Sequence, residues 1–300
     1  MHNQNYKNQV RLLLDVIPYV AKEECFALHG GTAINLFLLD MPRLSVDIDL
    51  TYIELESRAV TLQKISDALK RIKLDLEQNF AAIIVQHKIE IGKLLISHRN
   101  SNIKLEVNLV NRGVISSPMK MIVSKTVQDL YGVSAVMNVM PKGQLYGGKI
   151  CAALDRQHPR DLFDVKYLLE EGEVLSDEIR KGFLFNLLSC DRPIYEMLNP
   201  NLQNQQQAMD KQFQGMTAEI FTYKDFEETR LKLVKLIQSS LTQEDKQFLL
   251  SFENCKPNWL IYNFVQFPSI QWKLKNLNFL KETNPVKHLD HYKKLEMILN

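Results

Sequence analysis

The chain has 300 residues, of which 45% are hydrophobic and 24% charged, the composition of a soluble globular protein with a sizeable core. The 37 basic residues nearly balance the 35 acidic ones, so the net charge of +2 does not by itself indicate a nucleic-acid partner. No apolar run is long enough to span a membrane, the N-terminus does not resemble a secretory signal, and the four cysteines lack zinc-binding spacing. We therefore expect a cytoplasmic protein with reduced cysteines and no membrane partner.

Hydrophobic periodicity predicts alternating helices and strands in the first half of the chain. The clearest strand is 46–53, where apolar residues alternate with polar ones that include Asp47 and Asp49. The expected elements are, in order, a helix at 6–21, a strand at 26–28, a helix at 32–39, a strand at 46–53, a helix at 56–77, strands at 83–90, 93–98 and 104–109, and helices at 126–131, 145–156 and 161–170.

The second half of the chain carries helical patterns only. After about residue 172 the strand signals end, and helices are predicted at 179–188, 226–241, 246–252 and 288–299. We therefore predict an α/β N-terminal half, residues 1–172, and an all-α C-terminal half, residues 173–300. The glycine pair at 147–148 is unfavourable for the helix predicted around it.

Two carboxylates, Asp47 and Asp49, share one face of the predicted strand, because side chains two residues apart point the same way. Their Cα atoms would lie about 7 Å apart. Adjacent carboxylates repel each other unless a cation lies between them or one is protonated. Mg²⁺ is a hard cation that binds through one or two carboxylates together with substrate phosphates. The pattern indicates a Mg²⁺ site, although the same triplet also occurs on the solvated face of an edge strand.

A glycine pair stands upstream, where Gly30, Gly31 and Thr32 join the strand at 26–28 to the next helix. Paired glycines let the backbone approach a phosphate closely, and a helix N-terminus supplies free N–H groups. Thr32 could cap this helix or bind a phosphate oxygen. An ordinary strand–helix turn would use the same residues. Followed by a strand with two aspartates, however, the unit could hold a triphosphate and its metal.

Glu106 offers a third carboxylate on another predicted strand, whose opposite face is apolar. A third acid would complete a two-metal site, in which one ion holds the triphosphate and the other activates the attacking hydroxyl. The alternative is a surface glutamate on a half-exposed strand.

A second polar cluster lies between residues 149 and 164. Lys149 could neutralise a phosphate, and Arg156 or Arg160 could bind one through two hydrogen bonds. The alternative is a pair of salt-bridged helix ends, because Arg160 and Asp164 are four residues apart and Asp161 suits the first turn of a helix.

Taken together, these segments resemble the signature of the AbiEii/AbiGii-type nucleotidyltransferases, which belong to the DNA polymerase β-like superfamily. The matching segments are, in order, residues 29–35, 43–50, 104–108, 149–156 and 159–164. The resemblance covers about half of the chain, and the C-terminal half carries no matching motif. It implies a mixed-sheet nucleotidyltransferase fold.

The resemblance also implies a role for each candidate residue. The implied metal ligands and catalytic acids are Asp47, Asp49 and Glu106. The implied nucleotide contacts are Gly30, Gly31, Thr32, Ser45, Lys149 and Arg160, with Lys149 also catalytic. Asp161 or Asp164 would hold Lys149 or the active-site helix in place, so that Asp164 belongs to the catalytic set.

Members of this family are typically bacterial toxins of toxin–antitoxin or phage-defence systems, and some relatives attach nucleotides to the 3′ ends of tRNA. We therefore expect a nucleotidyltransferase toxin with Mg²⁺ or Mn²⁺ as cofactor, an NTP as substrate and a cognate antitoxin as partner. It would transfer NMP to a hydroxyl of RNA, such as the tRNA 3′ end, by a two-metal mechanism. The alternatives are transfer to a protein hydroxyl, a kinase-like phosphotransfer, and a non-catalytic NTP-binding module.

Overall fold

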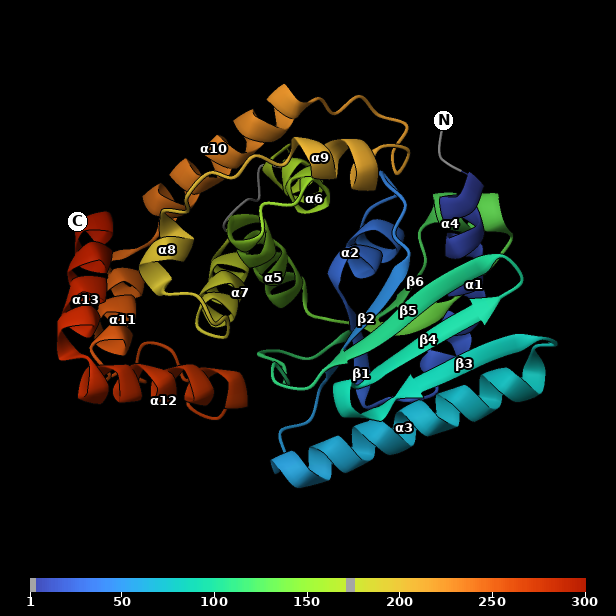
Figure 1. Cartoon of the computed structure of the whole chain (residues 1–300), viewed down its shortest axis with the longest axis horizontal. Coiled ribbons are helices and arrows are strands. Elements are labelled where there is room, and N and C mark those ends of the chain that lie inside the picture. Colours follow the sequence, from blue (N-terminus) through green and yellow to red (C-terminus); the bar gives the residue numbers. More distant parts are fainter. Residues whose placement is uncertain (1–3, 171–175) are drawn as a thin grey trace. The chain divides into compact units, whose positions relative to one another are not determined.

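The computed structural model describes residues 4–170 and 176–300 (Figure 1). The chain forms two compact units, the first made of Met1–Pro141 and Phe213–Ile220, the second of Lys142–Gln212 and Phe221–Asn300. A short segment late in the chain thus returns to the first unit. The boundary predicted at residue 172 lies outside the described residues, and the last two helices predicted in the N-terminal half belong to the second unit.

A mixed seven-stranded sheet forms the centre of the first unit, in the order β3-β4-β5-β2-β1-β7-β6. The β2–β5 and β1–β7 pairs are parallel and the other pairs are antiparallel, which confirms the predicted mixed sheet. The strands are β1 (Phe26–His29), β2 (Asp47–Tyr52), β3 (Ile83–Lys88), β4 (Lys93–His98), β5 (Ser101–Asn108), β6 (Met119–Ile122) and β7 (Val136–Val139).

Two long helices cover one face of this sheet. Helix α1 (Gln4–Val20) packs against β5 and β7, and helix α3 (Arg58–Asn79) lies along β3 and β4 (Figure 1). The period-two alternation buries Ile48 and Leu50 of β2 in the core. Asp47 and Asp49 therefore point to the other face, where both are partly exposed.

The connections complete the first unit. After β1 the chain forms α2 (Gly30–Ala33), which continues as the π-helix η1 (Ile34–Leu38). Together they correspond to the helix predicted at 32–39. A 3₁₀ turn, η2 (Ile89–Ile91), joins β3 to β4, and α4 (Lys125–Tyr131) joins β6 to β7. The sequence pattern did not predict β6 and β7, because strands of four residues are too short to show a clear period.

The second unit consists of helices in the part of the chain that the structure describes. They are α5 (Lys142–Asp155), α6 (Pro159–Glu170), α7 (Asp177–Leu187), α8 (Ile194–Leu198), α9 (Gln206–Ala208), η3 (Met209–Phe213), α10 (Tyr223–Ser240), α11 (Gln243–Glu253), α12 (Pro268–Thr283) and α13 (Pro285–Leu299). Capping boxes that begin at Thr222 and Thr242 set the starts of α10 and α11. None of the helices formed by residues 4–170 and 176–300 is long and apolar enough to cross a membrane.

Helices α5 and α7 pack with their backbones in contact at three glycines. A Cβ atom on Gly147 would lie 2.2 Å from the carbonyl carbon of Gly182, and one on Gly182 would lie 2.0 Å from the carbonyl oxygen of Gly143. The glycine pair at 147–148 is unfavourable for an isolated helix. Here the close helix crossing, which only glycine permits, outweighs that loss of helix propensity.

We predict that Gly147→Ala destabilises the second unit, although alanine is the better helix former. The added methyl group has no room, and overpacking of this kind should lower the free energy of unfolding by about 3 kcal/mol. Urea unfolding monitored by circular dichroism measures the change. Gly132→Ala is the control, because nothing lies within 4 Å of its Cβ position and only the strain of its φ of +60° remains, worth about 1 kcal/mol. An increase in stability of Gly147→Ala would contradict the prediction.

Candidate active site

The turn between β1 and α2 brings the backbone against the first acidic strand. Gly30 has a φ of +73°, a conformation that glycine adopts without strain. A Cβ atom at this position would lie 2.7 Å from Oδ2 of Asp49, so the Asp49 carboxylate rests directly on the glycine. Both the conformation and the contact therefore require glycine at position 30.

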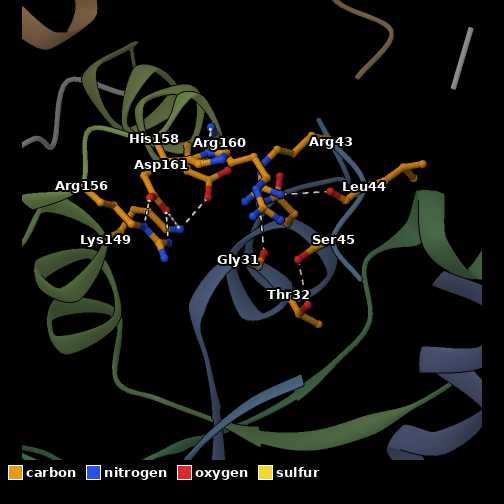
Figure 2. A network of polar contacts seen from close by, with 12 residues as sticks. Gly31, Thr32, Arg43, Leu44, Ser45, Lys149, Arg156, His158, Arg160 and Asp161 are labelled. Carbon is orange, nitrogen blue, oxygen red and sulfur yellow. Dashed lines mark hydrogen bonds and ion pairs between the residues drawn. The ribbon is translucent and has the colours of Figure 1, made fainter. Parts of the chain in front are cut away.

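Gly31 lies beneath a cationic and a hydroxyl side chain. A Cβ atom on Gly31 would be 2.6 Å from a guanidinium nitrogen of Arg43 and 3.2 Å from Oγ of Ser45. Arg43 is only 2% exposed and donates a hydrogen bond of 3.0 Å to the carbonyl of Leu44 (Figure 2). An arginine and a serine over a glycine at a strand–helix turn are groups that bind a phosphate oxygen.

Thr32 is buried, and its hydroxyl holds the turn to the start of β2. It donates to the backbone carbonyl of Asp47 and lies 2.9 Å from Oγ of Ser45 (Figure 2). A hydroxyl has a single hydrogen, so with that hydrogen directed at Asp47 the bond between the two side chains is donated by Ser45. Thr32 thus serves to position the loop, and Ser45 is the hydroxyl that can turn toward a phosphate.

A segment from late in the chain braces the loop that carries Arg43 and Ser45. The amide of Leu44 donates to the carbonyl of Met216 over 2.7 Å, and the hydroxyl of Thr217 donates to the carbonyl of Pro42 over 2.9 Å. These contacts explain why residues 213–220 belong to the first unit.

The three predicted acids share the open face of the sheet. In the parallel pairing of β2 with β5, Asp49 lies directly opposite Glu106, and Asp47 lies opposite Lys104. Neighbouring strands are about 4.8 Å apart. The pairing therefore brings Glu106, which is 57 residues further along the chain than Asp49, to the position next to it.

Two lysines neutralise part of this negative charge. Nζ of Lys93 and Nζ of Lys104 lie 3.1 and 3.2 Å from the same oxygen, Oε2 of Glu106. Partial burial acts to raise the pKa of Glu106, but its hydrogen bonds with the two lysines outweigh burial and lower the pKa. Burial likewise acts to lower the pKa of Lys104, and the charge of Asp47, the bond to Glu106 and the charge of Asp49 together raise it.

The donor set fits a hard divalent cation in its chemistry. Three carboxylates on one sheet face, with a backbone cradle at Gly30 that a side chain would fill, are groups that Mg²⁺ binds together with a triphosphate. Across the described residues, no three histidine, cysteine or acidic side chains are gathered closely enough to form a ready-made metal cluster. A cation held by Asp47, Asp49 and Glu106 would therefore need substrate oxygens or small side-chain rotations.

The second predicted cluster forms a closed ion-pair network within the second unit. Nζ of Lys149 lies 2.8 Å from Asp161 and 3.0 Å from Asp164 (Figure 2). Arg156 binds both oxygens of Asp161, at 2.6 and 3.0 Å. The lysine and both aspartates are at most 6% exposed. Salt-bridged helix ends are therefore present, joined through Lys149 and Arg156 to Asp161 and through Lys149 to Asp164.

Arg160 begins α6 beside this network. Its amide donates to Nδ1 of His158, whose other ring nitrogen lies 3.0 Å from the side-chain oxygen of Gln212 (Figure 2). Burial lowers the pKa of His158, which favours the neutral imidazole that accepts the bond from Arg160. The histidine thus caps the start of α6.

Sequence reasoning missed the two lysines at Glu106 and the brace from Met216 and Thr217. The alternation of 93–98 and 104–109 would have placed Lys93 and Lys104 on the open face, but only the strand register shows that both reach one carboxylate. The brace has no local signal, because its partners are more than 170 residues apart.

A strand–glycine–helix turn, paired acids on the next strand and a third acid beside them form a candidate nucleotide site on a mixed sheet. Comparison with known proteins gives the family. Residues 11–276 match the family model described as "Nucleotidyl transferase AbiEii toxin, Type IV TA system", so the chain belongs to this family of nucleotidyltransferase toxins from type IV toxin–antitoxin systems. The resemblance seen in the sequence is thereby confirmed.

A solved structure has the same fold. MenT4, a nucleotidyltransferase toxin from Mycobacterium tuberculosis H37Rv, superposes with a TM-score of 0.61 at 11% sequence identity. The match covers 92% of this chain and 95% of that chain. A search of curated proteins gave no match. Identity this low shows the common fold and leaves the substrate to be argued from the site.

We predict that Asp161→Asn destabilises the protein most at neutral pH. The buried carboxylate is held by Lys149 and Arg156, and these cations, against the opposing effect of burial, lower its pKa below the value of about 3.9 expected in the unfolded chain. A lowered folded-state pKa contributes stability that is complete above the unfolded pKa and is lost as the pH falls through the folded one. The variant should thus lose about 3 kcal/mol at pH 7 and less in acid.

Urea unfolding at several pH values between 7 and 3 measures this difference. Asp177→Asn is the matched control, because its carboxylate also pairs with an arginine, Arg180, at 2.8 Å but is 95% exposed. Its effect should be below about 0.5 kcal/mol at every pH. A difference between wild type and Asp161→Asn that grows as the pH falls would rule out the role given to this ion pair.

Proposed function

We propose that this toxin transfers a nucleoside monophosphate from an NTP to a hydroxyl of RNA, with the 3′ end of a tRNA as acceptor. The observation that carries the proposal is the alignment of Asp49 with Glu106 on adjacent parallel strands, directly over the glycine turn that begins α2. This arrangement puts acidic oxygens next to a phosphate-binding turn, which is the requirement for chemistry at a nucleotide phosphate.

The phosphate side of the site is formed by Gly30, Gly31 and the two side chains over Gly31. The N-terminal amides of α2 and the Arg43 guanidinium provide positive charge for the triphosphate, and Ser45 provides a hydroxyl. Thr32 supports this arrangement from within the core. For Lys149 and Arg160 of the second unit we propose nucleotide contacts because the family resemblance implies them, and for Asp164 the role of holding Lys149.

The acidic side of the site would hold a divalent cation through Asp47, Asp49 and Glu106, with Mg²⁺ or Mn²⁺ suited to oxygen donors of this kind. Bound there in a two-metal arrangement, the ions would supply charge neutralisation for the triphosphate and the attacking oxygen. The three carboxylates of this chain would hold them.

The proposed reaction is an in-line displacement. The acceptor oxygen forms a bond to the α-phosphorus while the bond from that phosphorus to the β-phosphate bridging oxygen breaks, and pyrophosphate leaves. The hydroxyl proton passes to a carboxylate of the acid group.

The biological setting follows from the family. A type IV toxin is opposed by an antitoxin, and we propose that this chain has a cognate antitoxin and acts in the cytoplasm, where NTPs and tRNA are found, in a system that can serve phage defence. The same site could instead modify a protein hydroxyl or transfer the γ-phosphate, and these are outcomes of the experiment below.

We predict that the purified protein labels RNA from an α-³²P-labelled NTP, and that Asp49→Ala abolishes the labelling. Loss of an oxygen ligand that contributes several kcal/mol at the transition state should lower the rate at least about a hundredfold. The assay combines Mg²⁺, total RNA and each of the four NTPs in turn. Growth of cells that express either form reports toxicity, which should fall in parallel.

Asp67→Ala is the control variant, because Asp67 is an exposed acid on α3 that bonds Gln63 in the same helix. Its activity should match that of the wild type. Label that comes from γ-³²P-labelled NTP would indicate a kinase-like reaction, and label on protein alone would move the acceptor to a protein hydroxyl. Full activity and toxicity of Asp49→Ala would refute the metal role.

A further inference from the structure

Lys104 lies on the same face of the sheet as the three acids and contacts one of them. On its own strand it precedes Glu106 by two residues, and across the parallel pair it lies opposite Asp47. Its ammonium lies 3.2 Å from Oε2 of Glu106, and the charges of Asp47 and Asp49 also act on it. Mutually repelling carboxylates need a cation among them, and here the chain itself provides one.

Lys93 reinforces this arrangement from the neighbouring strand. It lies directly opposite Glu106 in the antiparallel pairing of β4 with β5, and its ammonium is 3.1 Å from the oxygen that Lys104 also binds. Three carboxylates and two ammonium groups leave one net negative charge in the group. A divalent cation that approaches Glu106 therefore meets two lysines that already hold it.

We propose that Lys104, supported by Lys93, is an internal counter-cation that competes with divalent metal for Glu106, so that the acid group binds metal tightly only when an NTP accompanies it. The inference rests on the proposed function, since it assumes the metal role of Asp47, Asp49 and Glu106. Lys104 acts as a positioning residue, because it works through the carboxylate.

Binding of the triphosphate ends the competition between the lysines and the metal for Glu106. An NTP brings several negative charges, which offer the displaced ammonium groups new partners while the metal takes their place at Glu106. Metal and nucleotide then bind cooperatively. The metal alone would have to displace the lysines from Glu106, and the triphosphate gives these lysines a new partner. A purely structural role for the lysines, which would be to hold β4 to β5, predicts a loss of stability but no change in metal affinity.

The test measures Mn²⁺ binding to the whole protein without nucleotide, by electron paramagnetic resonance of free Mn²⁺. Lys104→Met removes the charge and keeps a long unbranched side chain, and it should bind Mn²⁺ about tenfold more tightly than the wild type. Lys93→Met should act in the same direction. Lys104→Arg keeps the charge and should retain the weak binding of the wild type.

Lys88→Met is the matched control. Lys88 lies opposite Lys93 on β3, in the same cross-strand row but one strand further from Glu106, and its removal should change Mn²⁺ affinity less than twofold. With a non-transferable NTP analogue present, the affinities of the wild type and Lys104→Met should converge to within about threefold.

Unchanged or weaker Mn²⁺ binding by both Lys104→Met and Lys93→Met would overturn the inference. The proposed function is judged separately, by Mn²⁺ binding in the presence of the NTP analogue and its loss in Asp49→Ala. If that binding is present and lost as expected, but the lysine variants show no tighter binding of Mn²⁺ alone, only the counter-cation role fails. If Mn²⁺ does not bind even with the analogue, the metal role and this inference fail together.

Discussion

Parallel pairing of β2 with β5 holds Asp49 beside Glu106, and the sheet must overcome the repulsion between these two carboxylates. At a separation of about 5 Å and an effective dielectric constant of about 20, two unit charges repel by about 3 kcal/mol, and exposure to water reduces this value. Five register pairs join the two strands, and each backbone hydrogen bond contributes about 1 kcal/mol. The sheet can therefore keep the acids together, and the lysines at Glu106 lower the cost further. The rest of the candidate site is arranged around this pair, since Gly30 touches Asp49 and Thr32 ties the turn to Asp47.

The two charged clusters of the protein illustrate different uses of carboxylates. In the second unit, Asp161 and Asp164 are buried with Lys149, and the exposed Arg156 pairs with Asp161 from the surface, so that two cations balance two anions. Charges taken out of water require such pairing, and these ion pairs join α5 to α6. In the first unit the acids are only half-buried, and the two lysines do not cancel their charge. Residual negative charge on an accessible face is what gives a site affinity for an incoming cation.

Much of the fold and part of the site could be predicted from the sequence. Features that depend on neighbouring residues were predicted, whereas those that depend on contacts between distant segments were not. The period of two placed Asp47 and Asp49 on one face, and helical spacing located most helices, because these are local properties of the backbone. The partner of Asp49 depends on which strands pair and in which register, which no local pattern records. The glycines of α5 reduce helix propensity locally. Their role is to let the backbone of α7 pack closely against α5, which the local sequence does not show. The brace on the Arg43 loop comes from a segment near residue 216 and has no signature of its own.

This chain shares its fold with MenT4 at only 11% sequence identity, so the fold alone does not determine the substrates of the reaction. The family model extends to residue 276, well into the helices that carry no motif of the chemistry, so these helices belong to the architecture of the family. The helices of the second unit keep their packing as long as side-chain volume and the hydrophobic period are kept. The glycine turn, the three acids and their lysines depend on particular chemical groups at particular positions. We therefore expect the choice of nucleotide to depend on the side chains around Asp47, Asp49 and Glu106, where a single lysine changes the charge that a substrate meets.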